Sequence, residues 1–307
     1  MSNAKELKNH IKSVSDTKKI TNAMYLIASV KMRKAKSDLD KTRPYFNAVK
    51  NEIKRIFRTV KDVNSRYFYP IDGEKKSSNK TYACLVITAD KGLAGKYNKN
   101  VLKEAEKMYL ENPNTKFFVV GKFGRQYFYR HDIPIEKSFL YTAQNPTMHR
   151  AREISEILLE LFDKNEVQKI YIIYTDMKNA MTEDAKTERL LPFHQKTFIS
   201  KKKEESSEVE FEFLPDIEEV LDNIIPSYIS GYIYSALVDS FCSEQSARMT
   251  AMNSAGKNAE KKLVELSAEY NRQRQAAVTQ EIIEISSGAK AQRNKVKKEN
   301  TREELYL

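Results

Sequence analysis

The sequence predicts a long antiparallel coiled coil, made by helices from the two ends of the chain, with an α/β domain inserted between them. Gly and Pro, the residues that most often interrupt helices, are unevenly distributed: no Gly precedes Gly73 and no Pro follows Pro226. Five of the eight Gly and five of the eight Pro fall within residues 70–192. This distribution predicts a helix, a compact middle and a second helix.

Apolar residues in the first segment, residues 1–62, recur at intervals of three and four, which predicts an amphipathic helix. The stripe comprises Leu7, Ile11, Val14, Ile20, Met24, Ile27, Ala28, Met32, Ala35 and Leu39. Pro44 is expected to kink this helix, which then resumes and reaches about residue 60. Lys18, Thr21 and Lys31 interrupt the stripe, so part of its surface is expected to serve other chains.

The last segment, residues 212–289, follows the same spacing at Met252, Ala255, Ala259, Leu263, Leu266, Tyr270, Gln273 and Ala277. An unbroken helix over residues 216–288 would be about 110 Å long. A domain of this size is only about 40–50 Å across, so such a helix cannot bury its stripe against the domain. The simplest partner is the first helix, in an antiparallel coiled coil. A charged extension, residues 290–307, follows and either prolongs the helix or frays.

The middle, residues 78–205, alternates apolar runs with helical patterns, which predicts an α/β layer whose sheet is at least partly parallel. We expect strands at residues 82–88, 116–120 and 169–175, and helices at residues 98–110, 123–130 and 147–163, the last capped by Thr147. Lys201–Ser207 is expected to be a solvated loop tip. The segment after it is expected to be an edge strand, because apolar and acidic residues alternate there at Val209, Phe211 and Phe213.

The positive charge belongs to the N-terminal segment. Residues 1–61 hold 16 Lys and Arg against 5 Asp and Glu, a surplus of 11 that equals the net charge of the whole chain. The cluster Lys31, Arg33, Lys34 and Lys36 could meet nucleic acid or an acidic protein surface. No zinc-finger or helix-turn-helix signature accompanies it.

Other features exclude several classes of protein. Cys84 and Cys242 are too few for a disulfide framework or a thiolate metal site. No run approaches 18 apolar residues, as a membrane-spanning helix requires. The N-terminus enters the amphipathic pattern without a targeting segment, so we expect a chain in the cytosol.

Catalytic motifs are poorly supported. Asp90–Tyr97 follows a strand and precedes a helix, the place where a doubly wound sheet binds phosphate. Its glycines are only two residues apart, however, and Tyr97 stands where a P-loop carries Ser or Thr, so a tight turn is favoured over a nucleotide site. Gly121–Arg125 is expected to be another turn. His10, His131, His149 and His194 share no metal-ligand spacing and are expected at the surface or at helix caps.

Segments at both chain ends resemble the signatures of one protein family. The first helix carries Ile11–Val14, Thr17–Met24 and Lys31–Ala35, similar to the family's N-terminal signature. The last helix carries Ser243–Met249, Ala251–Met252 and Tyr270–Ile282, similar to its C-terminal signature. The middle adds Asp90–Gly95 with Tyr97–Asn98, and Leu190–Pro192. Together these segments resemble the gamma subunit of F-type ATP synthases, and the resemblance covers about residues 3–289.

The resemblance implies a central rotor shaft with a Rossmann-like domain that holds no nucleotide, cofactor or metal. In such a shaft the coiled coil enters the hexamer of alpha and beta subunits, while the beta subunits carry out catalysis. Other implied partners are the epsilon subunit and the membrane c-ring, at the cytoplasmic face of a bacterial plasma membrane. The implied hexamer contacts are Met24, Lys31, Arg33, Lys34, Arg248, Gln275, Thr279 and Glu281.

Two other functions stay open at this point. One is a nucleotide-binding α/β enzyme with long helical arms, which tight binding of ATP would support. The other is a coiled-coil adaptor that binds nucleic acid through residues 1–61, which salt-dependent DNA binding would support. Lys96 stands where many relatives of the rotor family carry a small residue, so the packing of that turn is expected to differ.

Overall fold

The fold comes from a computed structural model that describes residues 2–59, 65–69, 81–140, 143–176, 184–193 and 216–303. The chain divides into two compact units, one made of Met1–Met24 and Met252–Leu307 and the other of Tyr25–Ala251. The helices are α1 (Ser2–Thr59), α2 (Tyr97–Glu111), α3 (Lys122–Arg130), α4 (Met148–Asp163) and α5 (Ile217–Glu303). The strands are β1 (Tyr82–Ile87), β2 (Thr115–Val120), β3 (Ile135–Phe139), β4 (Lys169–Thr175) and β5 (Ala185–Leu191).

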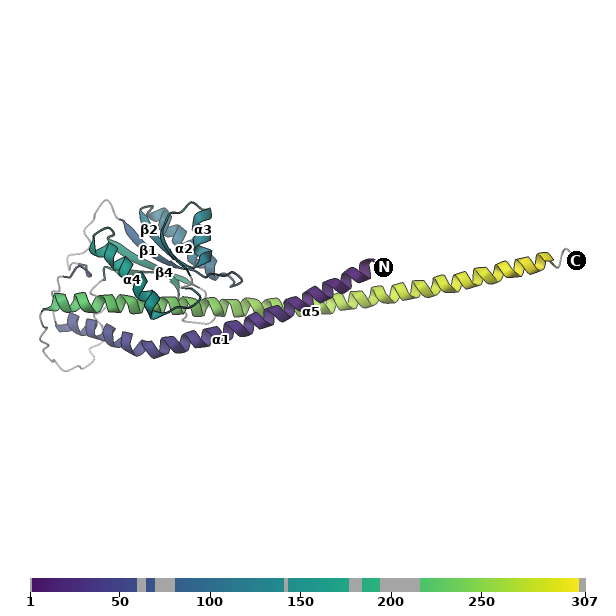
Figure 1. Cartoon of the computed structure of the whole chain (residues 1–307), viewed down its shortest axis with the longest axis horizontal. Coiled ribbons are helices and arrows are strands. Elements are labelled where there is room, and N and C mark those ends of the chain that lie inside the picture. Colours follow the sequence, from purple (N-terminus) through teal and green to yellow (C-terminus); the bar gives the residue numbers. More distant parts are fainter. Residues whose placement is uncertain are drawn as a thin grey trace. The chain divides into compact units, whose positions relative to one another are not determined.

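The larger unit, Tyr25–Ala251, is built on a five-stranded sheet in the order β3-β2-β1-β4-β5 (Figure 1). The first four strands of this order are parallel, and β5 pairs antiparallel with β4. On β1, Leu85 lies between Phe118 of β2 and Ile172 of β4. The prediction of an α/β layer with a partly parallel sheet is confirmed.

Side chains on alternate positions of β1 enter two different cores, because successive residues of a strand point to opposite faces. Ala83, Leu85 and Ile87 join the core that α4, α5 and α1 share. Cys84 and Val86 join a second core with α2 and α3. The sheet is therefore covered on both faces, which explains the continuous apolar runs inside its central strands.

Most elements of the middle lie where the sequence predicts them. The strands expected at residues 116–120 and 169–175 match β2 and β4 to within one residue, and Thr147 caps α4 by accepting a hydrogen bond from the Arg150 backbone N–H at 3.4 Å. The sequence did not predict β3 or β5. The predicted loop tip at Lys201–Ser207 and the predicted edge strand around Phe211 lie outside the described residues.

Within the larger unit, α1 runs antiparallel to α5. Phe46 packs on Tyr234, with ring centroids 6.3 Å apart, and nearer the chain's start the Met32 carbonyl lies 3.9 Å from the Cys242 sulfur. Gly231 makes the first approach possible, since a Cβ there would lie 2.0 Å from the Phe46 ring. Both helices contain a proline, Pro44 in α1 and Pro226 in α5, and both continue through it.

The smaller unit, Met1–Met24 with Met252–Leu307, repeats the antiparallel pairing. Lys18 forms an ion pair with Glu260 at 3.0 Å, and Thr21 faces Gly256. Thr21 is 7% exposed and donates its hydroxyl hydrogen bond to the Lys18 carbonyl, so its polar atom is satisfied inside the seam. These contacts accommodate Lys18 and Thr21, two of the three residues that interrupt the apolar stripe of α1.

The long C-terminal helix begins close to the predicted start and extends beyond the predicted end near residue 289. Asp216 accepts a hydrogen bond from the Glu219 backbone N–H at 2.8 Å, so α5 begins at Ile217, after this cap. The helix has 87 residues and continues to Glu303, which shows that the charged extension prolongs it. None of the described helices combines the length and the apolar character that crossing a bilayer requires.

A half-buried carboxylate on α5, that of Asp239, makes the stability of the larger unit depend on pH. Burial, and secondly the neighbouring Asp176, raise the pKa of Asp239 to about 6, although Arg43 and Lys186 oppose the shift. Because the folded-state pKa exceeds the ordinary aspartate value of 3.8, this group costs stability as pH rises from about 4 through 6.

We expect Asp239→Asn to raise the free energy of unfolding at pH 7.5 by up to about 3 kcal/mol, since one pKa unit corresponds to about 1.4 kcal/mol. At pH 3.5, where the carboxyl is protonated, the variant should match the parent. Urea unfolding at the two pH values measures the difference. An equal increase in the free energy of unfolding at both pH values would show that the stabilisation does not come from removing the Asp239 charge.

Candidate functional site

The predicted contact residues on α1 are divided between the two units. Met24 belongs to the smaller unit and is half-buried. Lys31, Arg33 and Lys34 belong to the larger unit and are exposed. Neither Arg33 nor Lys34 forms an ion pair with any residue that the structure describes. These two cations are therefore available to an anionic partner.

Arg248, another predicted contact residue, is buried and not exposed at the surface. Its side chain is 10% exposed and forms an ion pair with Glu244, itself 8% exposed, at 2.6 Å. The guanidinium also donates to the Gly92 carbonyl at 3.2 Å and to the Lys91 carbonyl at 3.4 Å. Arg248 thus ties α5 to the Asp90–Tyr97 turn. Burial raises the pKa of Glu244, and Arg248 opposes this shift.

The carboxyl ends of β1 and β4 form the edge at which a doubly wound sheet binds ligands. Here that edge is occupied by Ser240 and Ser243 of α5 and by Tyr97 of α2. Ser240 of α5 accepts a hydrogen bond from the Thr175 backbone N–H at 3.2 Å, and Ser243 donates to the Thr175 carbonyl at 3.4 Å. Tyr97, only 1% exposed, donates to the Ile87 carbonyl at 3.4 Å.

The backbone N–H groups at the start of α3 also have partners within the chain. Lys122 donates to the Asp90 side chain at 2.8 Å, and Gly124 donates to the Thr88 hydroxyl at 2.9 Å. Phe123 donates to the Ala89 carbonyl at 3.0 Å. A phosphate would need such donors free. The arrangement favours a closed structural turn over a nucleotide site.

Gly121 and Gly124, expected only to form a turn, allow the start of α3 to lie against Thr88. Gly121 has φ of 96°, and a Cβ there would lie 2.3 Å from the Thr88 carbonyl oxygen. A Cβ on Gly124 would lie 2.5 Å from the Thr88 hydroxyl oxygen. Neither Thr88 nor Glu244 is marked as a functional residue by the sequence pattern. The spacing of Glu244 and Arg248, four residues apart in a helix, is the signal that could have found the ion pair.

Among the histidines, His131 caps the C-terminal end of α3. Its Nδ1 lies 2.8 Å from the Tyr127 carbonyl, and its ring stacks on the Tyr127 ring with centroids 3.9 Å apart. His10 and His149 are exposed, and His194 lies outside the described residues. Where the structure describes the chain, no group of three metal-ligating side chains comes together.

The predicted C-terminal contact residues Gln275, Thr279 and Glu281 lie on a fully exposed stretch of α5. Every residue from 274 to 294 is exposed, including Gln275, Thr279 and Glu281. The Thr279 hydroxyl donates to the Gln275 carbonyl at 2.9 Å, so these two residues occupy one face, as their spacing predicts. Apolar side chains that would normally seek a partner are interspersed with them: Val278, Ile282, Ile283 and Ile285.

The chain is similar to known proteins over almost its whole length. A family model described as ATP synthase matches residues 3–292. The chain is 42% identical over 292 residues to the ATP synthase gamma chain of Ruminiclostridium cellulolyticum, covering 94% of this chain and 98% of that one. It is 37% identical over 303 residues to a gamma chain of Acetobacterium woodii described as sodium ion specific, with 94% and 98% covered.

Solved structures resemble the fold. A chain of the Tetrahymena thermophila mitochondrial ATP synthase central stalk and c-ring matches with a TM-score of 0.58 and 23% identity, over 77% of this chain and 99% of that one. A chain of the Euglena gracilis mitochondrial ATP synthase matches with a TM-score of 0.64 and 16% identity, over 94% of both chains.

Proposed function

The chain belongs to the gamma-chain family of ATP synthases, and from this membership we infer that it is the central-stalk subunit of an F-type enzyme. It is a non-catalytic part of the complex and belongs to the F1 portion, which is peripheral to the membrane. Its task is to couple rotation of the stalk to the conformational cycle of the catalytic subunits.

The observation that carries this proposal is the exposed segment of α5, residues 274–294. A helix whose every side chain is exposed over almost six turns gains nothing from its own fold there, since buried apolar area is what stabilises packing. Exposed Val278, Ile282 and Ile283 therefore support a partner that surrounds the helix. We infer that this partner is the hexamer of alpha and beta subunits.

A single helix inside a ring of three equivalent catalytic sites must treat them unequally, because it has no threefold symmetry. Gln275 and Thr279 share one face, so at any orientation they can meet only one beta subunit. Each site would then have its own contacts with the stalk, and its preferred conformation would depend on the stalk angle. This differential contact converts rotation into changes of nucleotide affinity.

We further propose that the exposed Lys31, Arg33 and Lys34 face acidic loops of the beta subunits and that Met24 lies in the same contact region. The excess positive charge of residues 1–61 supports this assignment. The same family membership leads us to propose the epsilon subunit and the c-ring as partners at the membrane end. We place the complex at the cytoplasmic face of a bacterial plasma membrane.

Co-expression with alpha and beta subunits tests the central-stalk assignment. We expect one copy of the full chain per three alpha and three beta subunits by native mass spectrometry, and ATP hydrolysis only when alpha and beta are present. ATP titrated into the isolated chain should give no stoichiometric binding, and DNA should not displace the chain from the complex. Stoichiometric ATP binding, or a failure to assemble, would count against the proposal.

A further inference from the structure

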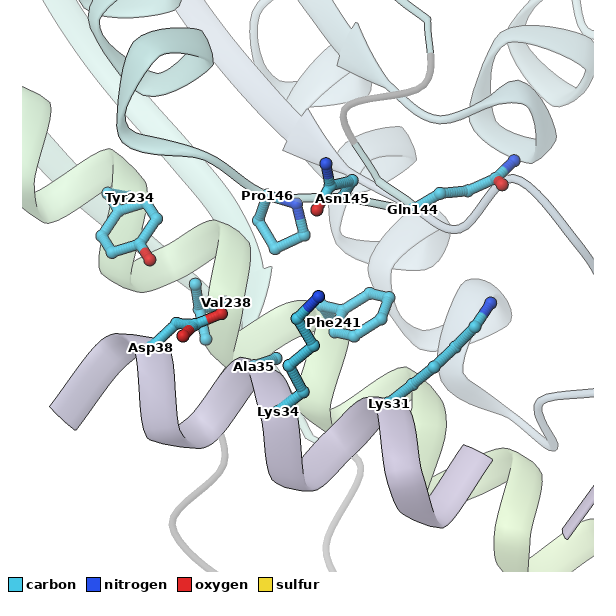
Figure 2. Close-up of a pocket in the computed structure, with 10 residues that line it drawn as sticks. All are labelled: Lys31, Lys34, Ala35, Asp38, Gln144, Asn145, Pro146, Tyr234, Val238 and Phe241. Carbon is cyan, nitrogen blue, oxygen red and sulfur yellow. The ribbon is translucent and has the colours of Figure 1, made fainter. Parts of the chain in front are cut away.

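One pocket of the larger unit is not explained by the stalk's structural role. It has a volume of about 360 Å³, within the range of small-molecule sites, and lies between α1, α5 and the loop that precedes α4 (Figure 2). All three elements contribute to it within one compact unit. Its shape is therefore fixed by the fold of that unit alone.

The inner wall of the pocket is apolar. Val238 and Phe241 of α5, which are 1% and 6% exposed, face Ala35 of α1 and Pro146 of the loop. Both α5 side chains also belong to the main core, so they are held in place by packing. A ligand's apolar part would find a preformed surface here.

The rim carries four polar side chains with unused hydrogen-bonding capacity. Lys31 and Lys34 rise from α1 toward the loop that bears Gln144 and Asn145 (Figure 2). None of the four makes a hydrogen bond or a close ion pair with a residue in the described part of the chain. Two ammonium groups and two carboxamides together can donate to a carboxylate or a phosphate.

Charge also sets the direction in which a ligand would lie. Asp38 lines the pocket one turn beyond Lys34, where it pairs with Lys41 at 3.5 Å and not with Lys34. Its charge, after the larger effect of burial, raises the pKa of the Tyr234 hydroxyl at the same end. An anionic group is disfavoured beside Asp38 and favoured between Lys31, Lys34 and the two amides.

We propose that this pocket binds a small organic anion, with its carboxylate or phosphate between Lys31, Lys34, Gln144 and Asn145 and its apolar body against Pro146 and the accessible edge of Phe241. Such a ligand joins α1 to the loop before α4 and occupies two lysines that we assign to hexamer contact. Only that last consequence depends on the proposed function. Binding itself is a property of the chain alone.

Isothermal titration of the full chain with 2-naphthoate tests the proposal, with 2-naphthalenemethanol as the neutral analogue of the same shape. We expect naphthoate to bind at one site at least tenfold more tightly than the alcohol. Lys31→Gln/Lys34→Gln, which alters only exposed side chains, should lower naphthoate affinity at least tenfold. The matched variant Arg33→Gln/Lys36→Gln removes the same charge outside the pocket and should stay within twofold of the parent.

Three results would overturn the inference. The first is equal affinity for naphthoate and the alcohol. The second is an equal loss of naphthoate affinity in both double variants, which would mean that the general positive charge of α1 attracts the anion and that no specific site exists. The third is displacement of naphthoate by a Glu- and Asp-rich peptide that binds more than tenfold more tightly, which would make the pocket a protein-docking site. The first two outcomes do not bear on assembly with alpha and beta subunits, and the third would support hexamer contact through Lys31 and Lys34, so the two proposals fail separately.

Discussion

Removing residues 274–307 is expected to lower the number of ions pumped per ATP hydrolysed about fivefold or more, because coupling between sites is typically worth about 1–3 kcal/mol. The deleted segment holds Gln275, Thr279 and Glu281, together with the exposed apolar residues that we assign to the hexamer interior. The enzyme should still hydrolyse ATP, since the catalytic residues are on other subunits. Membrane vesicles carrying the assembled complex allow both rates to be measured.

The truncated chain should nevertheless fold. The cores of the larger unit draw on α5 only up to Ala247, and the side chains from residue 274 to residue 294 are exposed. Thermal unfolding of the isolated chain should therefore show the transition of the larger unit unchanged.

A shorter deletion, residues 293–307, serves as the control because the family match ends at residue 292. It should leave the pumping ratio near that of the parent. Full coupling in the longer deletion would remove the C-terminal contacts from the proposal. A loss as large in the control would assign the coupling to the charged extension.

The central strands could be predicted from the sequence because their environment is uniform. β1, β2 and β4 are covered on both faces, so each carries an apolar run, at residues 82–87, 117–120 and 170–174. β3 and β5 lie at the two edges of the sheet, where charged residues are tolerated: Glu136 and Lys137 stand in β3, and Lys186 and Glu188 in β5. Such strands lack the apolar signal on which the prediction rested.

In the candidate site, contacts between residues close in the sequence could be predicted, whereas contacts between distant residues could not. The shared face of Gln275 and Thr279 follows from the helical period alone, and the structure agrees. The inward orientation of Arg248 depends on carbonyl groups of a turn more than 150 residues earlier in the chain. A charged residue on a predicted helix is normally exposed, and only the tertiary fold shows that this one is buried.

Arg248→Ala is expected to cost about 3–5 kcal/mol of unfolding free energy at pH 7, because it leaves Glu244 buried without its partner. Urea unfolding of the full chain measures this loss. Burial already raises the pKa of Glu244, and removing Arg248 should raise that pKa further, so the cost should shrink as pH falls below the new pKa. Amide exchange should also quicken in the Asp90–Tyr97 turn, which loses two hydrogen bonds from the guanidinium.

The double variant Glu244→Gln/Arg248→Met separates a structural role for Arg248 from the partner contact that the family resemblance implies. If the ion pair serves to bind α5 to the turn, the double variant should lose less stability than Arg248→Ala, since no charge is left buried. Its ion-pumping ratio in the assembled complex should then recover along with its stability. A variant that regains stability but still pumps poorly would instead identify Arg248 as a contact with the hexamer. The buried geometry, with both side chains at most 10% exposed, leads us to expect the first result.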